Sequence, residues 1–341
     1  MRALSISLFA LTTGCAPAIQ LTVLEPADVF VPQHIQTVAY VDRSVPKNVG
    51  QGVLGAVEGL LTGEGLGVDT QGRHRAGDAV KEVLQASPRF EVVVPVLSNE
   101  QAESSLFDKE MSWKAARAIC KEVACQGIVA LEAFDSDSLV ETRTEVVTEQ
   151  VDGREVKKKQ WVAQRETSVL TAWRLYDVQG KVVVDDLRDW KERNTWDARA
   201  ATEEQAIANL PGQARTVEDM AQRSGKSYGR RIAPTYVIVA RRMYKRGHDS
   251  LKIGVEHAMR SEWVRADKQW RKVYEGADPK LKARAAYNMA VDLERQGRLH
   301  EALTLAREAS RLGDKPRMNN YVRTLQERKR DADKLQQQMG G

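Results

Sequence analysis

The spacing of apolar residues over the first half of the chain predicts alternating strands and helices. An apolar, β-branched stretch at 21–44 is typical of strands. It is followed by a helical pattern at 76–87, a strand pattern at 89–96, a second helix at 112–124 and a strand at 127–134. This order predicts an α/β layer, in which helices cover a sheet.

The pattern then changes to long β-rich runs, which predict a three-stranded antiparallel meander. Two turn signals, "DG" at 152 and "VQG" at 178, separate these runs. A helix over 216–232 follows, with Thr216 and Asp219 spaced as a capping box. Its apolar face comprises Val217, Met220, Ala221, Ser224 and Tyr228. A strand over 234–244 completes an α/β domain that we expect at 26–245.

The last third of the chain has helical spacing and resembles tetratricopeptide repeats. The matching positions are Met289, Ala290, Leu293, Gly297, Ala302 and Ala309, and a degenerate copy aligns Trp263 with Leu299 and Ala266 with Ala302. We expect repeats at 246–317 and a capping helix with a tail at 318–341. Because about three repeats are needed for independent stability, this region should lean on the α/β domain. The predicted fold class is therefore α+β, followed by an all-α region.

The resemblance to tetratricopeptide repeats implies a groove that accepts a peptide or a helix. Its groove-facing positions in the better repeat are Arg284, Tyr287, Asn288, Val291 and Glu294. These five are the candidate partner-binding residues. Solvated or cap-packed side chains are the alternative interpretation of the same positions.

Two glycine motifs resemble phosphate-binding loops, but neither lies between a strand and a helix as such loops do. "GQGVLG" at 50–55 has dinucleotide-loop spacing, but eight residues separate it from the preceding strand pattern. "RSGKS" at 223–227 lies within a helical pattern, and Met220 stands where a P-loop requires glycine. Gly225 and Gly229 are expected to let that helix approach a sheet. The glycine-rich segment at 50–72 is read as a short covering helix or a mobile flap, and we expect no cofactor.

The first residues predict export. Arg2 precedes a short apolar run, and small residues at 12–14 come directly before Cys15. This arrangement resembles a bacterial lipobox, although Leu11 stands one position early. The resemblance implies a signal peptide at 1–14, lipid attachment at Cys15 and a tether at 15–25. An ordinary secretory signal is the alternative. Ala16 after the cysteine favours the outer membrane.

Composition and cysteine content bear on three further features: a nucleic-acid partner, a disulfide and a metal site. The 341 residues carry a formal charge of +5 that is scattered along the chain, which argues against a nucleic-acid partner. If Cys15 carries lipid, Cys120 and Cys125 remain as a possible disulfide in an oxidising compartment or as two buried thiols. Their surroundings offer no further histidine or cysteine for a metal site.

The phrase "ACQGIVALEAF" before a meander ending "TAWRLYDVQGKVVVDD" is similar to the small α/β domain of bacterial envelope proteins. These families include the curli-secretion lipoprotein, the lipoprotein activators of peptidoglycan synthases and the amino-terminal domain of TolB. The resemblance covers about residues 26–245 and implies a domain that binds proteins. Because the hairpin carries "GREVKKKQ", we expect it to be soluble, without the apolar band of a membrane barrel.

The sequence therefore predicts an envelope lipoprotein that acts as a scaffold or accessory factor without chemistry of its own. It would be lipid-anchored in the outer membrane, face the periplasm and bind an envelope protein or peptide. An envelope glycan hydrolase is the alternative, using Asp135 with Asp137 or Asp185 with Asp186. Adjacent carboxylates on a strand point to opposite faces, which weighs against the second pair.

Overall fold

The computed structural model describes residues 18–44, 67–96, 109–151, 153–313 and 316–340. The chain divides into two compact units. The sheet unit contains residues 26–235 together with 337–341, and the helical unit contains residues up to Glu25 together with 236–336. The mixed α/β part therefore comes first in the chain and an all-helical region follows it, but the first strand of the chain belongs to the helical unit.

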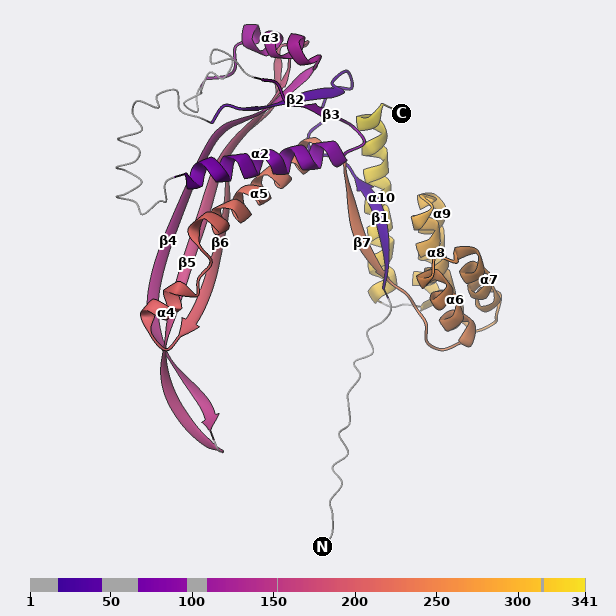
Figure 1. Ribbon diagram of the computed structural model, residues 1–341. Coiled ribbons are helices and arrows are strands. Elements are labelled where there is room, and N and C mark those ends of the chain that lie inside the picture. Colours follow the sequence, from indigo (N-terminus) through magenta and orange to yellow (C-terminus); the bar gives the residue numbers. More distant parts are fainter. Residues whose placement is uncertain (1–17, 45–66, 97–108, 152, 314–315, 341) are drawn as a thin grey trace, which may run out of the picture. The chain divides into compact units, whose positions relative to one another are not determined.

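The sheet unit is built on a five-stranded mixed sheet in the order β3-β2-β4-β5-β6 (Figure 1). Strand β2 pairs in parallel with β3 and with β4, whereas β4–β5 and β5–β6 are antiparallel. The predicted three-stranded meander is confirmed. The strands are β2 (Thr37–Asp42), β3 (Glu91–Val93), β4 (Gly127–Val151), β5 (Arg154–Asp177) and β6 (Val182–Ala200).

Helices cover both faces of this sheet. Along one face α2 and α5 lie side by side, and α3 lies on the other (Figure 1). Side chains alternate along β5, so Trp173 and Leu175 join the core under α2 and α5, whereas Tyr176 joins the core under α3. The helices are α2 (Val68–Ala86), α3 (Trp113–Val123), α4 (Glu203–Ala208) and α5 (Gln213–Ile232).

Helix α5 differs from the sequence expectation in two respects. It begins after Gly212, so Thr216 lies inside the helix and its hydroxyl donates to the Gln213 carbonyl instead of capping. Gly225 and Gly229 do not approach the sheet; they lie against α2. A Cβ atom on Gly225 would stand 2.2 Å from the Ala76 carbonyl oxygen, and one on Gly229 would stand 2.7 Å from the Val83 Cβ. The glycines therefore serve a close crossing of two helices.

Cys120 and Cys125 form a disulfide. Helix α3 ends at Val123, and Ala124 follows with a left-handed backbone (φ 56°), which turns the chain before β4 begins. This early helix end brings two cysteines only five positions apart within bonding reach.

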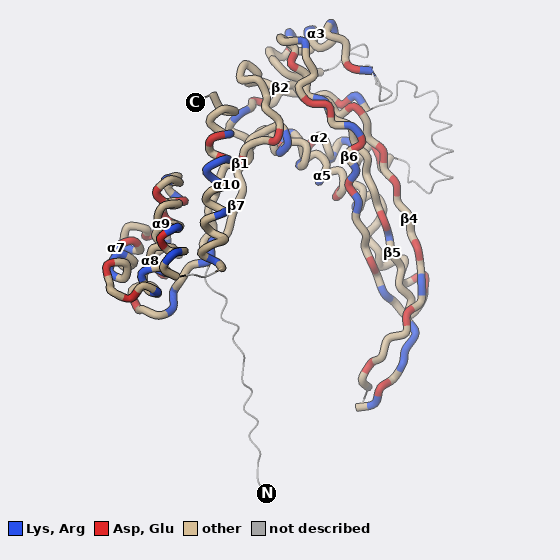
Figure 2. Tube along the Cα trace, turned by 180° about the vertical axis from the view of Figure 1, so that it is seen from behind, with Lys and Arg blue, Asp and Glu red and all other residues tan. Residues whose placement is uncertain are grey.

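Strands β4 and β5 extend past the last pairing of β6, which joins Trp161 to Ala200. Residues 145–151 and 154–160 pair only with each other and form a two-stranded ribbon. Charged residues of both signs lie on the ribbon, with Glu145 and Glu149 on β4 and Lys157, Lys158 and Lys159 on β5 (Figure 2). The ribbon also exposes Val146 and Val156.

The helical unit combines a two-stranded sheet, β1–β7, with five helices. Ile19, Leu21 and Val23 of β1 and the partly buried Val237 and Val239 of β7 belong to its core. The strand expected at 234–244 therefore joins the helices and not the α/β sheet. The elements are β1 (Ala18–Glu25), β7 (Thr235–Arg242), α6 (Asp249–Met259), α7 (Trp263–Tyr274), α8 (Pro279–Arg295), α9 (Leu299–Gly313) and α10 (Pro316–Met339).

Some predicted features lie outside the described residues. They include Cys15, the motif at 50–55 and the glycine-rich segment as far as 66; from Val68 onward that segment is the start of α2. Among the helices that the structure describes, none combines the length and the apolar character that crossing a membrane requires.

Candidate functional site

The five predicted groove residues lie on α8, and other parts of the same chain cover most of their surface. Tyr287, Asn288, Val291 and Glu294 are buried, and Arg284 is half-buried. Their burial contradicts the expectation that these side chains are exposed for binding a partner. Parts of the same unit, namely β7, the segment after it and α10, occupy this face.

The contacts on this face resemble those expected for a bound peptide. The Asn288 side chain donates to the Tyr244 carbonyl at 2.7 Å and accepts from the Tyr244 amide at 2.9 Å. The Arg284 guanidinium donates to the Arg246 carbonyl at 2.7 Å. The chain therefore supplies its own extended segment where a partner's was expected.

A buried ion pair fixes β7 against the same face. The Arg241 guanidinium donates to both carboxylate oxygens of Glu294, at 2.9 and 2.7 Å, and the Tyr321 hydroxyl donates to one of them at 2.8 Å. The Tyr287 ring lies between those of Tyr244 and Tyr321, with centroids 5.0 and 4.8 Å away. Burial raises the pKa of Tyr287 to about 12, so its hydroxyl stays neutral.

A different surface of the helical unit is open. Helices α7, α8 and α9 enclose a hollow of about 740 Å³. Both apolar and charged side chains line it. The lining residues are Trp263, Val264, Asp267, Arg271, Tyr274, Met289, Asp292, Leu293, Arg295, Gln296, Arg298, Glu301, Thr304, Leu305 and Glu308.

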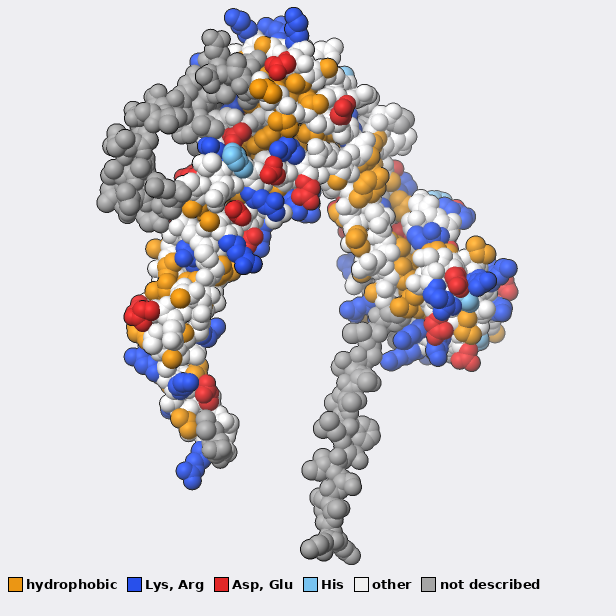
Figure 3. Space-filling model, in the orientation of Figure 1, with side chains coloured by type: hydrophobic (Ala, Val, Ile, Leu, Met, Phe, Trp, Pro, Cys, Tyr) orange, Lys and Arg blue, Asp and Glu red, His pale blue; other side chains and the backbone are white. Residues whose placement is uncertain are grey.

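The charged groups around this hollow are fixed by one another. The Arg295 guanidinium lies 4.5 Å from the ring centroid of Trp263 and also pairs with Asp292 at 2.8 Å. The Tyr274 hydroxyl donates to Glu308 at 2.6 Å, and this hydrogen bond, with burial, raises the pKa of Tyr274 to about 12. The hollow therefore offers aromatic and aliphatic surface inside a rim of oriented charges, which is the usual composition of a protein-binding patch. Charges of both signs cover the helical unit more widely (Figure 3).

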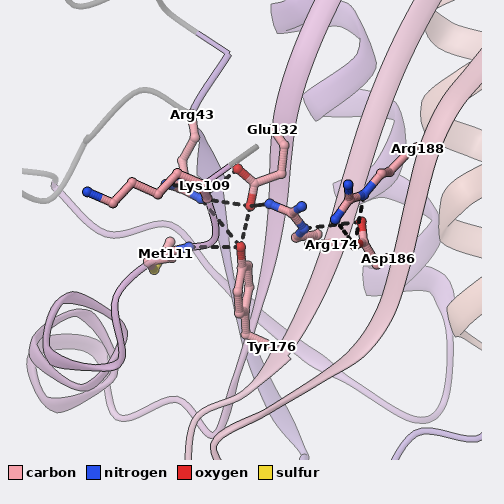
Figure 4. Close-up of polar contacts among 8 residues, drawn as sticks. All are labelled: Arg43, Lys109, Met111, Glu132, Arg174, Tyr176, Asp186 and Arg188. Atoms are coloured by element: carbon pink, nitrogen blue, oxygen red, sulfur yellow. Dashed lines mark hydrogen bonds and ion pairs between the residues drawn. The ribbon is translucent and has the colours of Figure 1, made fainter. Parts of the chain in front are cut away.

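The sheet unit contains a buried polar network under its α3 face (Figure 4). Arg43 directly follows β2, Glu132 lies on β4, and Arg174 and Tyr176 lie on β5; all are less than a tenth exposed. The Arg43 guanidinium donates to Glu132 at 2.8 and 2.5 Å, and Arg174 pairs with the same carboxylate at 3.8 Å. Glu132 lies in a β-bulge, because the register of β4 against β5 shifts between Leu131 and Ala133. This bulge aims the carboxylate at both arginines.

Tyr176 and Asp186 extend the network. The Tyr176 hydroxyl donates to Glu132 at 2.5 Å and accepts from the Met111 amide at 3.1 Å. Burial, followed by the Glu132 charge, raises the pKa of Tyr176 to about 12. Burial opposes ionisation of Asp186, but hydrogen bonds from Arg188 and Arg174 outweigh it and lower the pKa of Asp186. The network is too buried to receive a substrate, and its arrangement is that of a structural centre.

Of the carboxylates considered for a hydrolase, Asp185 and Asp186 pair with different arginines, whereas Asp135 and Asp137 lie close enough for one charge to act on the other. Asp185 pairs with Arg231 of α5 at 2.8 Å, whereas Asp186 pairs with Arg174 on the α3 face. Burial and then the nearby charge of Asp137 raise the pKa of Asp135. Among the described residues, no group of three or more histidine, cysteine or acidic side chains is arranged to hold a metal ion.

These features define a class of protein, a mixed α/β sheet unit joined to a helical unit that carries an open hollow. The chain belongs to the family described as "Domain of unknown function (DUF8603)", whose match covers residues 35–244. A second family, "Domain of unknown function (DUF6340)", matches residues 252–327.

A solved structure of the hypothetical protein CT253 from Chlamydia trachomatis is similar at 13% identity and a TM-score of 0.22. The similarity covers 57% of this chain and 92% of that one. No curated protein gives a significant match.

Proposed function

We propose that this chain is a lipid-anchored scaffold of a bacterial envelope, which binds a partner protein in the hollow between α7, α8 and α9. The observation that carries the proposal is this solvent-open hollow of about 740 Å³ with Trp263 and Tyr274 in its wall. Partly buried aromatic residues inside a polar rim commonly dominate binding energy at protein interfaces. The buried network of the sheet unit offers no comparable access.

The burial pattern supports the tetratricopeptide-like part of the proposal. Ala266 of α7 and Ala302 of α9 are 36 positions apart, and both are fully buried. The same offset relates Trp270 to Ala306 and Val255 to Val291, which are all buried. Two similar helix pairs, α6–α7 and α8–α9, would thus stack with α10 as their cap.

Envelope attachment rests on the segment before the described residues. Cys15 follows a short apolar run and small residues, which is the arrangement that acylation requires in the lipoproteins it resembles. We place the chain on the outer membrane, facing the periplasm. Replacing Cys15 with serine should abolish labelling by a fatty-acid probe and release the protein from membranes. Unchanged labelling of that variant would contradict the anchor.

The binding proposal is tested by site-specific photo-crosslinking in intact cells. A crosslinker at Val264, which is 74% exposed at the hollow, should trap a defined partner band. The same group at Lys329, an exposed position of α10, is the control. Adding Trp263→Ala should weaken partner binding roughly thirtyfold and lower the yield at Val264, because truncating an aromatic anchor costs about 2 kcal/mol. Equal yields at the two positions, unaffected by Trp263→Ala, would show that the hollow is not the binding surface.

The hydrolase alternative has a direct assay. The purified chain is incubated with peptidoglycan, and released fragments are sought by mass spectrometry. Fragments that disappear in an Asp135→Asn variant would replace the scaffold proposal with an enzymatic one.

A further inference from the structure

A second pocket of the helical unit lies where β7 ends, beside the first turns of α10. It is an open cavity of about 420 Å³. Arg241 and Arg242 come from β7, Arg317 and Asn320 from α10, and the rings of Tyr287 and Tyr321 form the buried part of its wall. Thr324 extends the α10 side, so this helix contributes positions 317, 320, 321 and 324, which share one face.

The pocket has an excess of positive charge. Three of its lining residues are arginines, and none is acidic. Arg241 is neutralised by Glu294 at 2.7 Å. In the part of the chain that the structure describes, Arg242 and Arg317 have no carboxylate partner within ion-pair distance. Arg317 instead lies over the Tyr244 ring, 5.0 Å from its centroid. The charges of Arg242 and Arg317 are therefore not balanced by a carboxylate of the described residues.

The position of Arg317 adds an independent argument. It lies in the first turn of α10, where the helix dipole and the free amide groups already produce positive potential. A cation there is mildly disfavoured, and a nearby bound anion would offset this cost. Asn320 can contribute a donor as well, because its side-chain oxygen accepts from Arg323 and its amide nitrogen is the atom that can donate to a ligand.

We propose that this arginine pocket binds a phosphate group carried by a larger molecule. Guanidinium groups bind phosphate oxygens through paired, charge-assisted hydrogen bonds. A phosphate monoester carries up to about two negative charges near neutral pH and therefore matches the two uncompensated arginines better than a single carboxylate does. The cavity is also wider than one phosphate, with two tyrosine rings to contact the remainder of the molecule. The carrier is a lipid headgroup or a soluble phosphorylated compound.

The test uses the full chain with Cys15→Ser, so that no lipid anchor contributes to binding. Isothermal titration with inorganic phosphate and glycerol 3-phosphate is compared with acetate, and co-sedimentation compares phosphatidylglycerol vesicles with phosphatidylcholine vesicles. Arg242→Gln with Arg317→Gln should weaken phosphate binding at least tenfold. Arg330→Gln, on an exposed part of α10, is the matched control and should leave binding unchanged. Circular dichroism melts check that each variant is folded.

The outcomes separate the two sources. Binding of glycerol 3-phosphate that the double variant loses identifies a soluble phosphorylated ligand. Arginine-dependent binding that is confined to phosphatidylglycerol vesicles identifies a lipid headgroup. The proposal is overturned if acetate binds as tightly as the phosphates, if no phosphate binds in either form, or if the control and the double variant behave alike.

Discussion

At the scale of single residues, the most constrained position is Glu132. Its side chain is 1% exposed and pairs with Arg43, whose side chain is 2% exposed. Removing one member of a buried ion pair leaves the other charge without compensation and costs far more than losing a surface pair. Glu132 therefore holds two strands and two arginines in place.

Glu132→Gln should lower the free energy of unfolding by about 3 kcal/mol or more, because it removes the buried negative charge that Arg43 and Arg174 share, and Arg174 then keeps only Asp186 of its two carboxylate partners. Glu166→Gln on β5 is the control, since Glu166 is 46% exposed and pairs with an exposed arginine; its effect should stay within about 0.5 kcal/mol. Urea unfolding followed by circular dichroism measures both. If both variants lost equally little free energy of unfolding, the buried network would contribute little to stability.

The sequence alone could assign these residues to strands, but it could not show which of them contact one another. "GIVALEAF" predicts a strand, and a glutamate in such an apolar run is a signal of a buried charge. Its partner Arg43 is 89 positions away, and the bulge that orients Glu132 depends on β5. Tyr287 was predicted to face a partner, but it is buried and its ring contacts are Tyr244 and Tyr321 of the same chain.

At the scale of elements, the crossing of α2 and α5 depends on glycine. The Ala76 carbonyl and the Ala79 methyl group occupy the space that a side chain at Gly225 would need. Helix propensity alone would favour alanine at this position by about 1 kcal/mol. Glycine at this position lowers the intrinsic stability of α5 but allows α2 and α5 to pack closely.

Gly225→Ala should destabilise the protein by about 1–3 kcal/mol, the usual cost of overpacking a tight contact, less the gain in helix propensity. Gly212→Ala, at the N-cap of the same helix and with open space around it, is the comparison and should change stability by less than about 1 kcal/mol. Thermal melts of the two variants provide the measurement. A Gly225→Ala variant more stable than the wild type would mean that the helices can separate without cost.

Most individual elements were predictable because each has a clear periodicity. The helix at 112–124 and the meander are confirmed. The partner of β7 was not predictable, since a run such as "TYVIVARR" suits any sheet and its alternation identifies a buried face without identifying what covers it. The short helix α4 follows Thr202, which caps it, and this cap was the available signal.

At the scale of the whole molecule, the helical unit is assembled from separate parts of the chain. Its core includes Ile19, Leu21 and Val23 from β1 and receives Val237 and Val239 from β7. A fragment that starts at residue 246 lacks both strands. It would expose the faces of α8 and α10 on which these side chains lie.

The isolated fragment 246–341 should therefore lack a cooperative thermal transition, whereas residues 236–336 linked to residues 18–25 should regain one. Burying a valine, leucine or isoleucine side chain contributes about 1.5–3 kcal/mol, so losing five such side chains exceeds the margin of a small domain. Circular dichroism melts of both fragments and of the intact chain make the comparison. A fragment 246–341 that unfolds cooperatively at the temperature of the intact chain would contradict this assembly.

The pairing of β1 with β7 also sets an order of events during synthesis. The two strands are separated by residues 26–234, which make up nearly all of the sheet unit. At ordinary rates of about 5–20 residues per second, β1 waits roughly 10–40 s before its partner exists. Closing so long a loop is unfavourable until the intervening unit has collapsed. The strand made first is thus among the last to be incorporated, and its apolar face must be shielded in the meantime.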